Sequence, residues 1–405
     1  MGAARLMTQA TLELADTLTV QLKERLDIGL LLVVAALIGL GLVMVASSSI
    51  GVAEKTFNNP FHFMLRQSIY VAIGLGLAFV MYEIPLRLWE TTGPIMLVVA
   101  LVLLVLVLIP GFGRTVNGAT RWVDLGVFDI QVSEIAKLLM VMYMAGYIVR
   151  HGHAIRSTLV GFFKPLAVVA VLSGLLLMEP DFGASVVILL VTMGMMFLGG
   201  VRVIQFASLF AFAAGLFAII AVTSPYRMLR LTSFLNPWAD PLNTGYQLTQ
   251  ALIAIGSGSW FGAGLGSSIQ KLFYLPEAHN DFMFAILAEE LGLVGVMTVL
   301  VLFVYAVWRA FAIGATAERA GHAFGAYIAF GIGLWVGIQA FVNIGVNMGI
   351  LPTKGLTLPF MSAGGSSMIV MCAAIGLLLR VHRETHDLKL KGVRSIGRPR
   401  RKVKS

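Results

Sequence analysis

The stretch YLPEAHNDFMFAILAEELG, residues 274–292, gathers ionisable side chains at the start of an apolar run. Glu277 and Asp281 flank His279 within it. A carboxylate such as Asp281 can act as a general base when its environment brings its pKa toward the working pH. The same residues also fit a helix start, with Asn280 as N-cap and Asp281 in the first turn, and His279 also fits a packed side chain.

Two further acids, Glu289 and Glu290, follow two turns into the expected helix. A charged side chain at the centre of a bilayer costs about 2.5–3.5 kcal/mol on insertion scales. We therefore expect at least one of these glutamates to have a polar partner inside the protein.

A second group of ionisable residues lies in QVSEIAKLL, where Glu134 and Lys137 are three residues apart. On a helix they share one face and can neutralise each other, either beside a reaction site or as an interfacial ion pair that caps the helix. Further along the chain, EPDF places Glu179 and Asp181 around Pro180. This pattern predicts an ordinary helix start, with proline in the first turn and aspartate nearby.

Cations suited to a phosphate group precede the opening stretch. They are Arg227, Arg230 and Lys271, and arginine is well suited to bidentate phosphate contact. The full set of candidate substrate-binding residues is Arg121, Arg227, Arg230, Gln247, Lys271, Glu277 and His279. The residue pattern leaves open whether a metal ion takes part.

These polar groups must be positioned by a chain that is mostly apolar. Hydrophobic residues make up 58 % of the 405 residues and charged residues 12 %, whereas soluble domains have about 25 % charged residues. The composition therefore predicts a polytopic membrane protein. The single Cys372 excludes an intrachain disulfide and a Cys-rich metal site. Ten lysines and arginines fall in residues 380–405, a cytoplasmic tail pattern that fits contact with anionic membrane lipids rather than nucleic acid.

Apolar runs of about 20 residues predict about ten transmembrane helices. They fall at residues 28–50, 68–85, 91–110, 133–150, 164–179, 183–200, 203–223, 284–308, 322–349 and 358–380. The basic residues, above all those of the tail, place both termini in the cytoplasm. The expected organisation is a cytoplasmic segment 1–27, an all-α membrane domain 28–380 and a basic cytoplasmic tail 381–405.

One loop is much longer than the others. Residues 224–283 run for about 60 residues without a spanning segment and separate the seventh helix from the eighth. A long ordered loop is usually functional, and the predicted orientation makes this one extracytoplasmic. The ionisable groups of residues 274–292 then lie at the outer end of the eighth helix.

Five stretches carry a family resemblance: QVSEIAKL, EPDFGA, YRMLRLTSFLNPWADPLNTGYQLTQ, GLGSSIQKLFYLPEAHNDFMFAILAEELG and LPTKGLTLPFMSAGGSS. From about the first span to the tenth, the chain resembles the SEDS family of bacterial peptidoglycan polymerases. NPWADP, QKLFYLPEAHND and PTKGLTLP are closer to its cell-division branch than to its elongation branch. The resemblance implies a fold of about ten helices, with a large periplasmic loop between helices seven and eight.

The resemblance also implies an activity. The family joins the sugars of lipid II into glycan strands: an acceptor 4-hydroxyl attacks the anomeric carbon of the donor, undecaprenyl diphosphate departs and the configuration inverts. Asp281 matches the family's essential aspartate and would take the proton. Glu134 and Lys137 match its fourth-helix acid and lysine, and would orient or tune that base. Arginines and lysines, with or without a divalent cation (Mg or Mn), would bind the diphosphate.

The chain departs from the family pattern at Val132, Glu179, Ala251 and Ala363, where relatives usually have Pro, Gln, Ser and Tyr. None of these changes removes the candidate base. The implied partners are a cognate class B penicillin-binding protein, FtsI, and the divisome subunits FtsQ, FtsL and FtsB, at the division septum of the bacterial inner membrane. An elongation polymerase, a lipid II flippase and a purely structural division scaffold are the alternatives; charges that cluster at the outer helix ends favour surface chemistry over transport.

Overall fold

The computed structural model describes residues 25–116, 119–124, 126, 129–223, 228, 234–352 and 355–396. Within these residues ten long helices correspond to the ten predicted spans. They are α2 (Ile28–Phe57), α3 (His62–Glu83), α5 (Gly93–Leu108), α6 (Val132–Ser157), α7 (Leu159–Met178), α8 (Phe182–Leu198), α9 (Val203–Val222), α12 (Met283–Arg319), α13 (Ala323–Asn347) and α14 (Gly365–Ile396). Seven are long and apolar enough to cross a membrane, and α5, α8 and the first part of α9 are shorter apolar helices. The predicted polytopic helical fold is confirmed.

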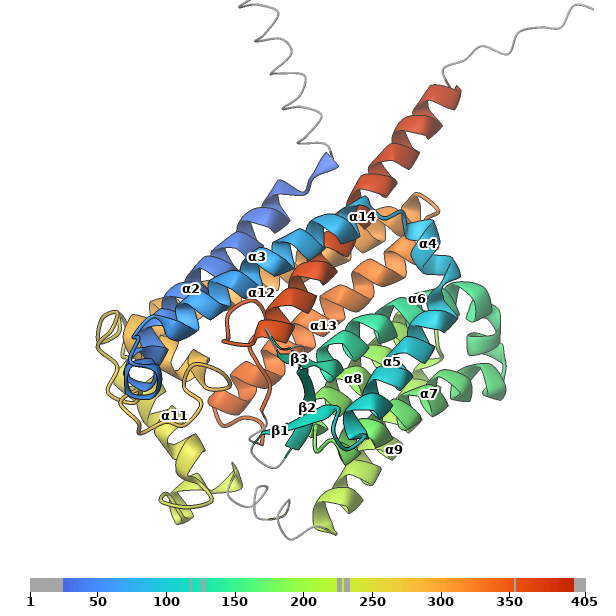
Figure 1. Cartoon of the computed structure of the whole chain (residues 1–405). Helices are drawn as coiled ribbons and strands as arrows, with labels where there is room; N and C mark the ends of the chain where they lie inside the picture. The colour runs from blue at the N-terminus through green and yellow to red at the C-terminus, as the bar shows by residue number, and fades with distance from the viewer. Residues whose placement is uncertain are drawn as a thin grey trace, which may run out of the picture.

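The helices pack into one bundle in which α6, α13 and α14 are the most buried (Figure 1). These three are less hydrophobic than α2, α7 and α12, although the exposed α3 has a similar hydropathy. A helix surrounded by protein can pair its polar groups with its neighbours. Trp335, Phe284, Phe324 and Phe360 are among the largest fully buried side chains. The start of α2 and the end of α14 lie at one end of the bundle, and the small sheet lies toward the other (Figure 1).

A small antiparallel sheet, which the sequence did not predict, is added to this confirmed helical fold. The strands β1 (Gly113–Val116), β2 (Ala119–Asp124) and β3 (Asp129–Gln131) connect α5 to α6 in the order β1-β2-β3. The β-branched and aromatic residues of β2 favour an extended backbone, and Trp122 pairs with Gln131 across β2 and β3. Strand pairing satisfies the backbone of a connection too short and too polar to span a membrane. The sheet thereby places Arg121 and Trp122 over the ends of the helices.

The start of α12 also differs from the prediction. The helix begins at Met283, so Asp281 precedes it and Asn280 is not its N-cap. Residues 277–282 instead form turns, in which the amides of Asn280 and Phe282 both donate to the Glu277 carbonyl (3.0 and 3.3 Å). The Asn280 side chain donates through Nδ2 to the Glu277 carboxylate (2.5 Å), and Phe282 takes the N-cap position of the helix.

Two other helix ends refine the predicted spans. Asp181 is the N-cap of α8 and accepts a hydrogen bond from the Ala184 amide (3.1 Å), so Pro180 lies before the helix and not in its first turn. The last helix begins at Gly365, later than predicted, and continues past residue 380 to Ile396. Residues 358–364 form turns that remain available to line a site.

Shorter elements complete the described chain. They are α4 (Leu86–Thr91), the 3₁₀ turn Pro237–Ala239 and α11 (Tyr246–Ser257). The last two lie between α9 and α12, and α11 packs against α12. The long connection therefore contains ordered structure of its own, although the side of the membrane on which it lies stays a prediction.

Candidate active site

A polar cavity of about 640 Å³ lies where the sheet meets the starts of α6 and α8 and the segments that precede α12 and α14. Its walls therefore come from parts of the chain that are far apart in sequence. Six of the ten predicted site residues line it: Arg121, Glu134, Gln247, Glu277, His279 and Asp281. The fold brings together most of the side chains that were singled out by their chemistry.

Asp281 is partly buried in the wall of this cavity. Its backbone carbonyl accepts hydrogen bonds from the side-chain amides of Asn343 (3.0 Å) and Asn347 (2.9 Å) on α13. Among the described residues, none donates a hydrogen bond to its carboxylate. A Cβ atom at Gly355 would lie 2.9 Å from Asp281 Oδ2, so a glycine leaves room for this side chain. The main chain of Asp281 is held while its carboxylate stays open to the cavity.

The cavity also sets the protonation of these groups. Burial, together with the Glu277 and Asp181 carboxylates and against the opposing charge of Arg121, raises the pKa of the Asp281 carboxyl to about 7. Burial lowers the pKa of His279 despite the adjacent Glu277, which keeps the imidazole neutral near pH 7. A base is most effective when its pKa lies near the working pH, and Asp281 meets that condition.

Three amide side chains on α13 organise this wall, and they were not predicted from the sequence. Gln339, Asn343 and Asn347 are four residues apart and share one helix face. In addition to its bond to Asp281, Asn343 donates to the Leu356 carbonyl (2.5 Å), and Gln339 donates to the Thr357 carbonyl (3.0 Å). Their regular spacing in an otherwise apolar span was the signal that could have revealed them, because polar side chains in a span need partners.

Glu134 and Lys137 form a buried ion pair with 2.7 Å between Lys137 Nζ and Glu134 Oε1. Lys137 also donates to Gln339 Oε1 (2.8 Å), and its Nζ lies 5.4 Å from the centre of the Trp335 ring. The predicted shared face and mutual neutralisation are confirmed. Glu134 reaches the cavity wall, whereas Lys137 lies deeper, against α13. The pair connects α6 with the same α13 face that holds Asp281.

Arg121 on β2 is fixed by the backbone of the turn between α7 and α8. Its Nε and Nη2 donate to the carbonyls of Glu179 (3.1 Å) and Pro180 (2.5 Å). The Glu179 carboxylate is fully buried, and neither oxygen has a hydrogen-bond partner among the described residues. Burial and the Asp181 carboxylate raise the pKa of Glu179 to about 8, although Arg121 lowers it. Because carbonyls fix the guanidinium, its charge stays available to an anion in the cavity.

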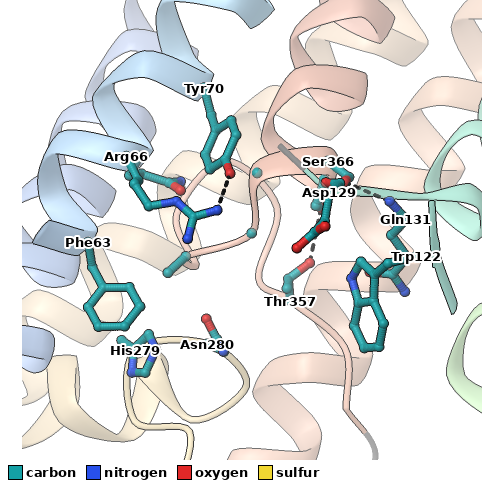
Figure 2. Close-up of a pocket in the computed structure, with 15 residues that line it drawn as sticks. Phe63, Arg66, Tyr70, Trp122, Asp129, Gln131, His279, Asn280, Thr357 and Ser366 are labelled. Atoms are coloured by element: carbon teal, nitrogen blue, oxygen red, sulfur yellow. Dashed lines mark hydrogen bonds between the residues drawn. The ribbon is translucent and has the colours of Figure 1, made fainter. Parts of the chain in front are cut away.

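A smaller pocket of about 210 Å³ adjoins the cavity beside α3 (Figure 2). Phe63, Arg66 and Tyr70 of α3 line it, and Arg66 Nη2 donates to the Tyr70 hydroxyl (2.8 Å). The two spaces share Trp122, Gln131, His279, Asn280, Thr357, Ala363 and Gly364. Together they form one groove whose aromatic and hydrogen-bonding walls suit an extended polar ligand with apolar ring faces.

The remaining predicted binding residues lie elsewhere. Lys271 is not in the cavity wall: its Nζ pairs with the buried Glu290 carboxylate (2.7 Å) and donates to Ser47 Oγ (3.0 Å). Its position therefore supports the neutralisation of a buried acid and not the predicted contact with a diphosphate. Arg227 and Arg230 lie outside the described residues.

The sequence did not decide whether a divalent cation takes part, and the cavity offers few side chains that could bind one. Within the described ranges no group of three or more His, Cys, Asp or Glu side chains is placed to hold a metal ion. Asp181 is occupied by hydrogen bonds from Gln131 Nε2 (3.1 Å) and Ser133 Oγ (2.8 Å). Glu134 is paired with Lys137, so Asp281 and Glu277 are the cavity acids left to face a cation. These two carboxylates fit a cation that shares its coordination with a bound phosphate better than a site made by protein alone.

Comparisons with known proteins agree with this arrangement. Residues 28–387 match the FtsW/RodA/SpoVE family, described as cell cycle proteins. The probable peptidoglycan glycosyltransferase FtsW of Thioalkalivibrio sulfidiphilus (strain HL-EbGR7) is 59 % identical over 377 residues, which cover 93 % of this chain and 94 % of that protein. The relative of the same name from Coxiella burnetii (strain RSA 493 / Nine Mile phase I) is 49 % identical over 361 residues, or 89 % of this chain and 97 % of that protein.

Two solved structures share the fold. One belongs to work on the structural coordination of polymerization and crosslinking by a peptidoglycan synthase complex; it is 31 % identical, has a TM-score of 0.73 and covers 89 % of this chain and 98 % of that chain. The other is the rod shape determining protein RodA of Thermus thermophilus, 30 % identical with a TM-score of 0.65, covering 89 % and 97 %. The greater identity to the FtsW relatives confirms the predicted similarity to the cell-division branch.

Proposed function

The chain belongs to the FtsW/RodA/SpoVE family of cell cycle proteins, and on that premise we propose that it is a peptidoglycan glycosyltransferase of the cell-division type. Its substrate is lipid II, a disaccharide-peptide linked through diphosphate to a polyprenyl chain. The observation that carries the proposal is the Asp281 carboxylate, open to a polar cavity at one end of a membrane bundle and with a pKa of about 7.

Asp281 serves as the general base. It takes the proton of the acceptor 4-hydroxyl while that oxygen attacks the donor anomeric carbon from the side opposite the diphosphate. A new glycosidic C–O bond forms, the bond to the diphosphate breaks with its electron pair, and the configuration inverts. The raised pKa favours proton uptake, and a positioned base of this kind contributes about 10²–10⁴-fold to the rate.

The other cavity residues assist this step. Arg121 is placed to bind the departing diphosphate, since a guanidinium contacts phosphate oxygens in bidentate fashion. Gln247, Glu277 and His279 line the same space and meet the polar sugar and peptide groups. The Glu134–Lys137 pair acts through Gln339, which bonds both Lys137 and the segment that faces Asp281. A divalent cation at Asp281 and Glu277 would supply further positive charge to the diphosphate.

A lipid II flippase is the alternative from a different class. Transporters of that kind place their binding site near the middle of the bilayer, between discontinuous helices. Here Glu134 is the third residue of α6, and Asp281 precedes α12. A cavity built from helix ends supports chemistry at the membrane surface, where a lipid-linked donor meets a growing polar strand.

The protein is a multi-pass membrane protein. We place it in the bacterial inner membrane at the division septum, with segment 1–27 and tail 381–405 in the cytoplasm and loop 224–283 in the periplasm. Its likeness to a chain of a peptidoglycan synthase complex supports a transpeptidase partner, a penicillin-binding protein. FtsI in that role, together with FtsQ, FtsL and FtsB, completes the proposed assembly.

The test is polymerisation of purified lipid II by the purified protein, followed by gel electrophoresis of the products. Glycan strands from the wild-type protein, and none from a folded Asp281→Asn variant, are the expected result. Movement of labelled lipid II across a vesicle membrane without any polymer would replace the polymerase proposal with the flippase. If the protein were active in neither assay, the remaining hypothesis would be a structural division scaffold.

A further inference from the structure

Helix α12 is interrupted nine residues after its start, and part of the preceding segment fills the gap. Gly292 has φ 64° and ψ −163°, a conformation that glycine reaches without the strain a side chain would add. On the first side of this break, the amides of Ala263 and Gly264 donate to the carbonyls of Glu289 and Glu290 (2.9 and 3.1 Å). The helical carbonyls that the break frees are therefore satisfied by the loop.

The second side of the break is satisfied in the reverse direction. The amides of Leu293 and Val294 donate to the carbonyls of Ser259 and Trp260 (3.0 and 3.1 Å). Irregular backbone at membrane depth is tolerated only where its polar groups have partners. We name residues 258–272 the inserted loop. Its backbone and the backbone of the broken helix provide partners for each other through the four hydrogen bonds described above.

Side chains of the inserted loop point their polar atoms toward the protein. Glu289 accepts hydrogen bonds from the Ser268 hydroxyl and from the Ile269 amide (2.9 Å). Glu290 pairs with Lys271 (2.7 Å). Both glutamates are at most 3 % exposed, so the loop neutralises or binds two acids buried at the base of the break. This anchorage fixes one face of the loop.

The opposite face of the inserted loop is apolar and uncovered by any described residue. It consists of Trp260, Phe261, Leu265, Ile269 and Leu272, which are 67, 82, 57, 63 and 54 % exposed. A loop in water would be expected to place these side chains inward and its long polar side chains outward. Here Ser268 and Gln270 are buried and Lys271 is mostly buried, while only the small Ser259 and Ser267 are exposed beside the apolar side chains. Polar groups inward and apolar groups outward is the arrangement suited to lipid.

The apolar face of the loop is continuous with the outer surface of α12. Val294, bonded to Trp260, is 51 % exposed, and Met297 and Val301 follow it along the helix at 50 and 62 %. Arg309, paired with Asp27, marks the opposite end of the span. At 1.5 Å per residue, Val294 lies about 22 Å from Arg309, within the roughly 30 Å of a hydrocarbon core.

The far part of the loop region reaches the charged end of α2. The Lys55 ammonium lies over the ring of Phe273, 4.9 Å from its centre. Ser47, which contacts Lys271, is about 12 Å closer to the middle of α2 than Lys55 at the helical rise. Aromatic rings beside a lysine are typical of the level of the lipid head groups. The inserted loop and Phe273, which follows it, thus lead from Trp260 beside the outer surface of α12 to the lysine at the end of α2.

We propose that the inserted loop is seated in one leaflet of the bilayer, with Trp260, Phe261, Leu265, Ile269 and Leu272 in contact with acyl chains. The occupant we assign to this face is the acyl chains, because the face continues onto the exposed outer surface of α12. The contact anchors the segment that leads to Asp281, because Glu289 and Glu290 hold the loop against the first part of α12.

Spin labels at single cysteines test this placement. In a Cys372→Ala background, Phe261→Cys and Ile269→Cys carry the nitroxide, and the full-length protein is reconstituted in vesicles of phosphatidylethanolamine and phosphatidylglycerol. Val301→Cys is the lipid-exposed reference, and Asn243→Cys in the exposed turn before α11 is the aqueous reference. The ratio of collision rates with oxygen and with a water-soluble nickel chelate reports the surroundings of each label. Lipid II polymerisation and thermal melting check each labelled protein.

Both loop labels are expected to have a high oxygen-to-nickel ratio, close to that of the Val301 label. A ratio equal to that of the Asn243 label would mean that the loop faces water and would overturn the proposal. Low collision rates with both reagents would also overturn it, because the loop would then be covered by protein. Two loop sites are used so that a local disturbance by one label does not decide the result, since Phe261 and Ile269 are eight residues apart and both exposed.

Discussion

Asp281 and Glu179 are two carboxyls with raised pKa values, and their surroundings separate their roles. The Asp281 carboxylate opens into the cavity, so it can exchange a proton with a ligand. The Glu179 carboxyl is fully buried behind Arg121 and has no hydrogen-bond partner in the described part of the chain. A chemical role therefore falls to the first, while the second affects the folded protein mainly through its charge state.

Asp281→Asn is expected to lower lipid II polymerisation by about 10²–10⁴-fold, because asparagine keeps the shape of the side chain and cannot accept the proton. Wild-type activity is expected to fall as the pH drops below about 7, the pKa of Asp281. Product yield on gels from pH 5.5 to 8.5, with a melting curve for the same preparation, measures both effects. Near-normal polymer from a folded variant would move the search for the base to Glu277.

Glu179→Gln is expected to keep near-wild-type activity and to raise stability at alkaline pH. The folded state raises the pKa of Glu179 from 4.5 to about 8, so it favours the neutral carboxyl, and wild-type stability falls as the pH rises between these values. Glutamine is neutral throughout, and the carbonyls that hold Arg121 are unchanged. Melting temperatures should therefore differ little at pH 5 and by several degrees at pH 9. An equal difference at both pH values would contradict this account.

The residue types and the family resemblance together singled out Asp281, Glu134, Lys137, Arg121 and His279, because charges and imidazoles are conspicuous in an apolar chain. They did not reveal that Lys271 forms an ion pair with Glu290, since that pairing depends on a loop that folds back onto the break in α12. Asn343 and Asn347 escaped notice because an uncharged amide in a span gives a weak signal until its partner is known. The spacing of residues along the sequence could not predict these contacts, because they join distant parts of the chain.

At the scale of the elements, α13 connects the site. One of its faces bonds Asp281 through Asn343 and Asn347, and Gln339 on the same face bonds Lys137 of α6. Hydropathy predicted that α13 and α6 would span a membrane, but not that they would be neighbours. The sheet was missed for a related reason: its three short strands are stabilised by pairing with one another and contain no long apolar run.

Asn343→Leu and Asn347→Leu are expected to reduce kcat for polymerisation while KM for lipid II stays near the wild-type value. Each removes a donor to the Asp281 carbonyl, and a misplacement of about 1 Å can cost about 10²-fold in rate. Ile344→Ala, on the same helix and also buried, is the matched control, expected to lower the melting temperature and leave kcat unchanged. Loss of kcat in the control to the same degree would show only a general effect of damaging α13.

Glu134→Gln and Lys137→Met are each expected to destabilise the protein by about 3–5 kcal/mol, because a single change strands a buried charge. The double variant should recover much of that loss, since it removes both charges, while polymerisation stays low in all three proteins. Chemical unfolding and the lipid II assay, run together, separate the two effects. Single variants with wild-type stability and activity would reduce the pair to an interfacial helix cap.

At the scale of the whole molecule, the helices place a polar reaction cavity at one end of a bundle whose sides are apolar. The sheet, the start of α6 and the segment before α12 meet at that end, so the donor's lipid can stay in the bilayer while its sugars enter the cavity. The end of α14 lies at the opposite end of the bundle, the same end as the start of α2 (Figure 1). Separation of the cavity from the chain ends fits synthesis on the outer side of the membrane and an inner basic tail.

This arrangement predicts the topology of the whole chain. Ten basic residues in 380–405 favour the cytoplasm for the tail, and the shared end of α2 and α14 places residue 28 on the same side. A reporter enzyme that is active only in the periplasm should therefore be silent when fused after Ser405. The same reporter inserted after Asn243, in the exposed turn before α11, should be active. A strong signal from the Ser405 fusion and silence at Asn243 would show the opposite membrane orientation. The Asp281 cavity would then face the cytoplasm, which would exclude polymerisation on the outer surface.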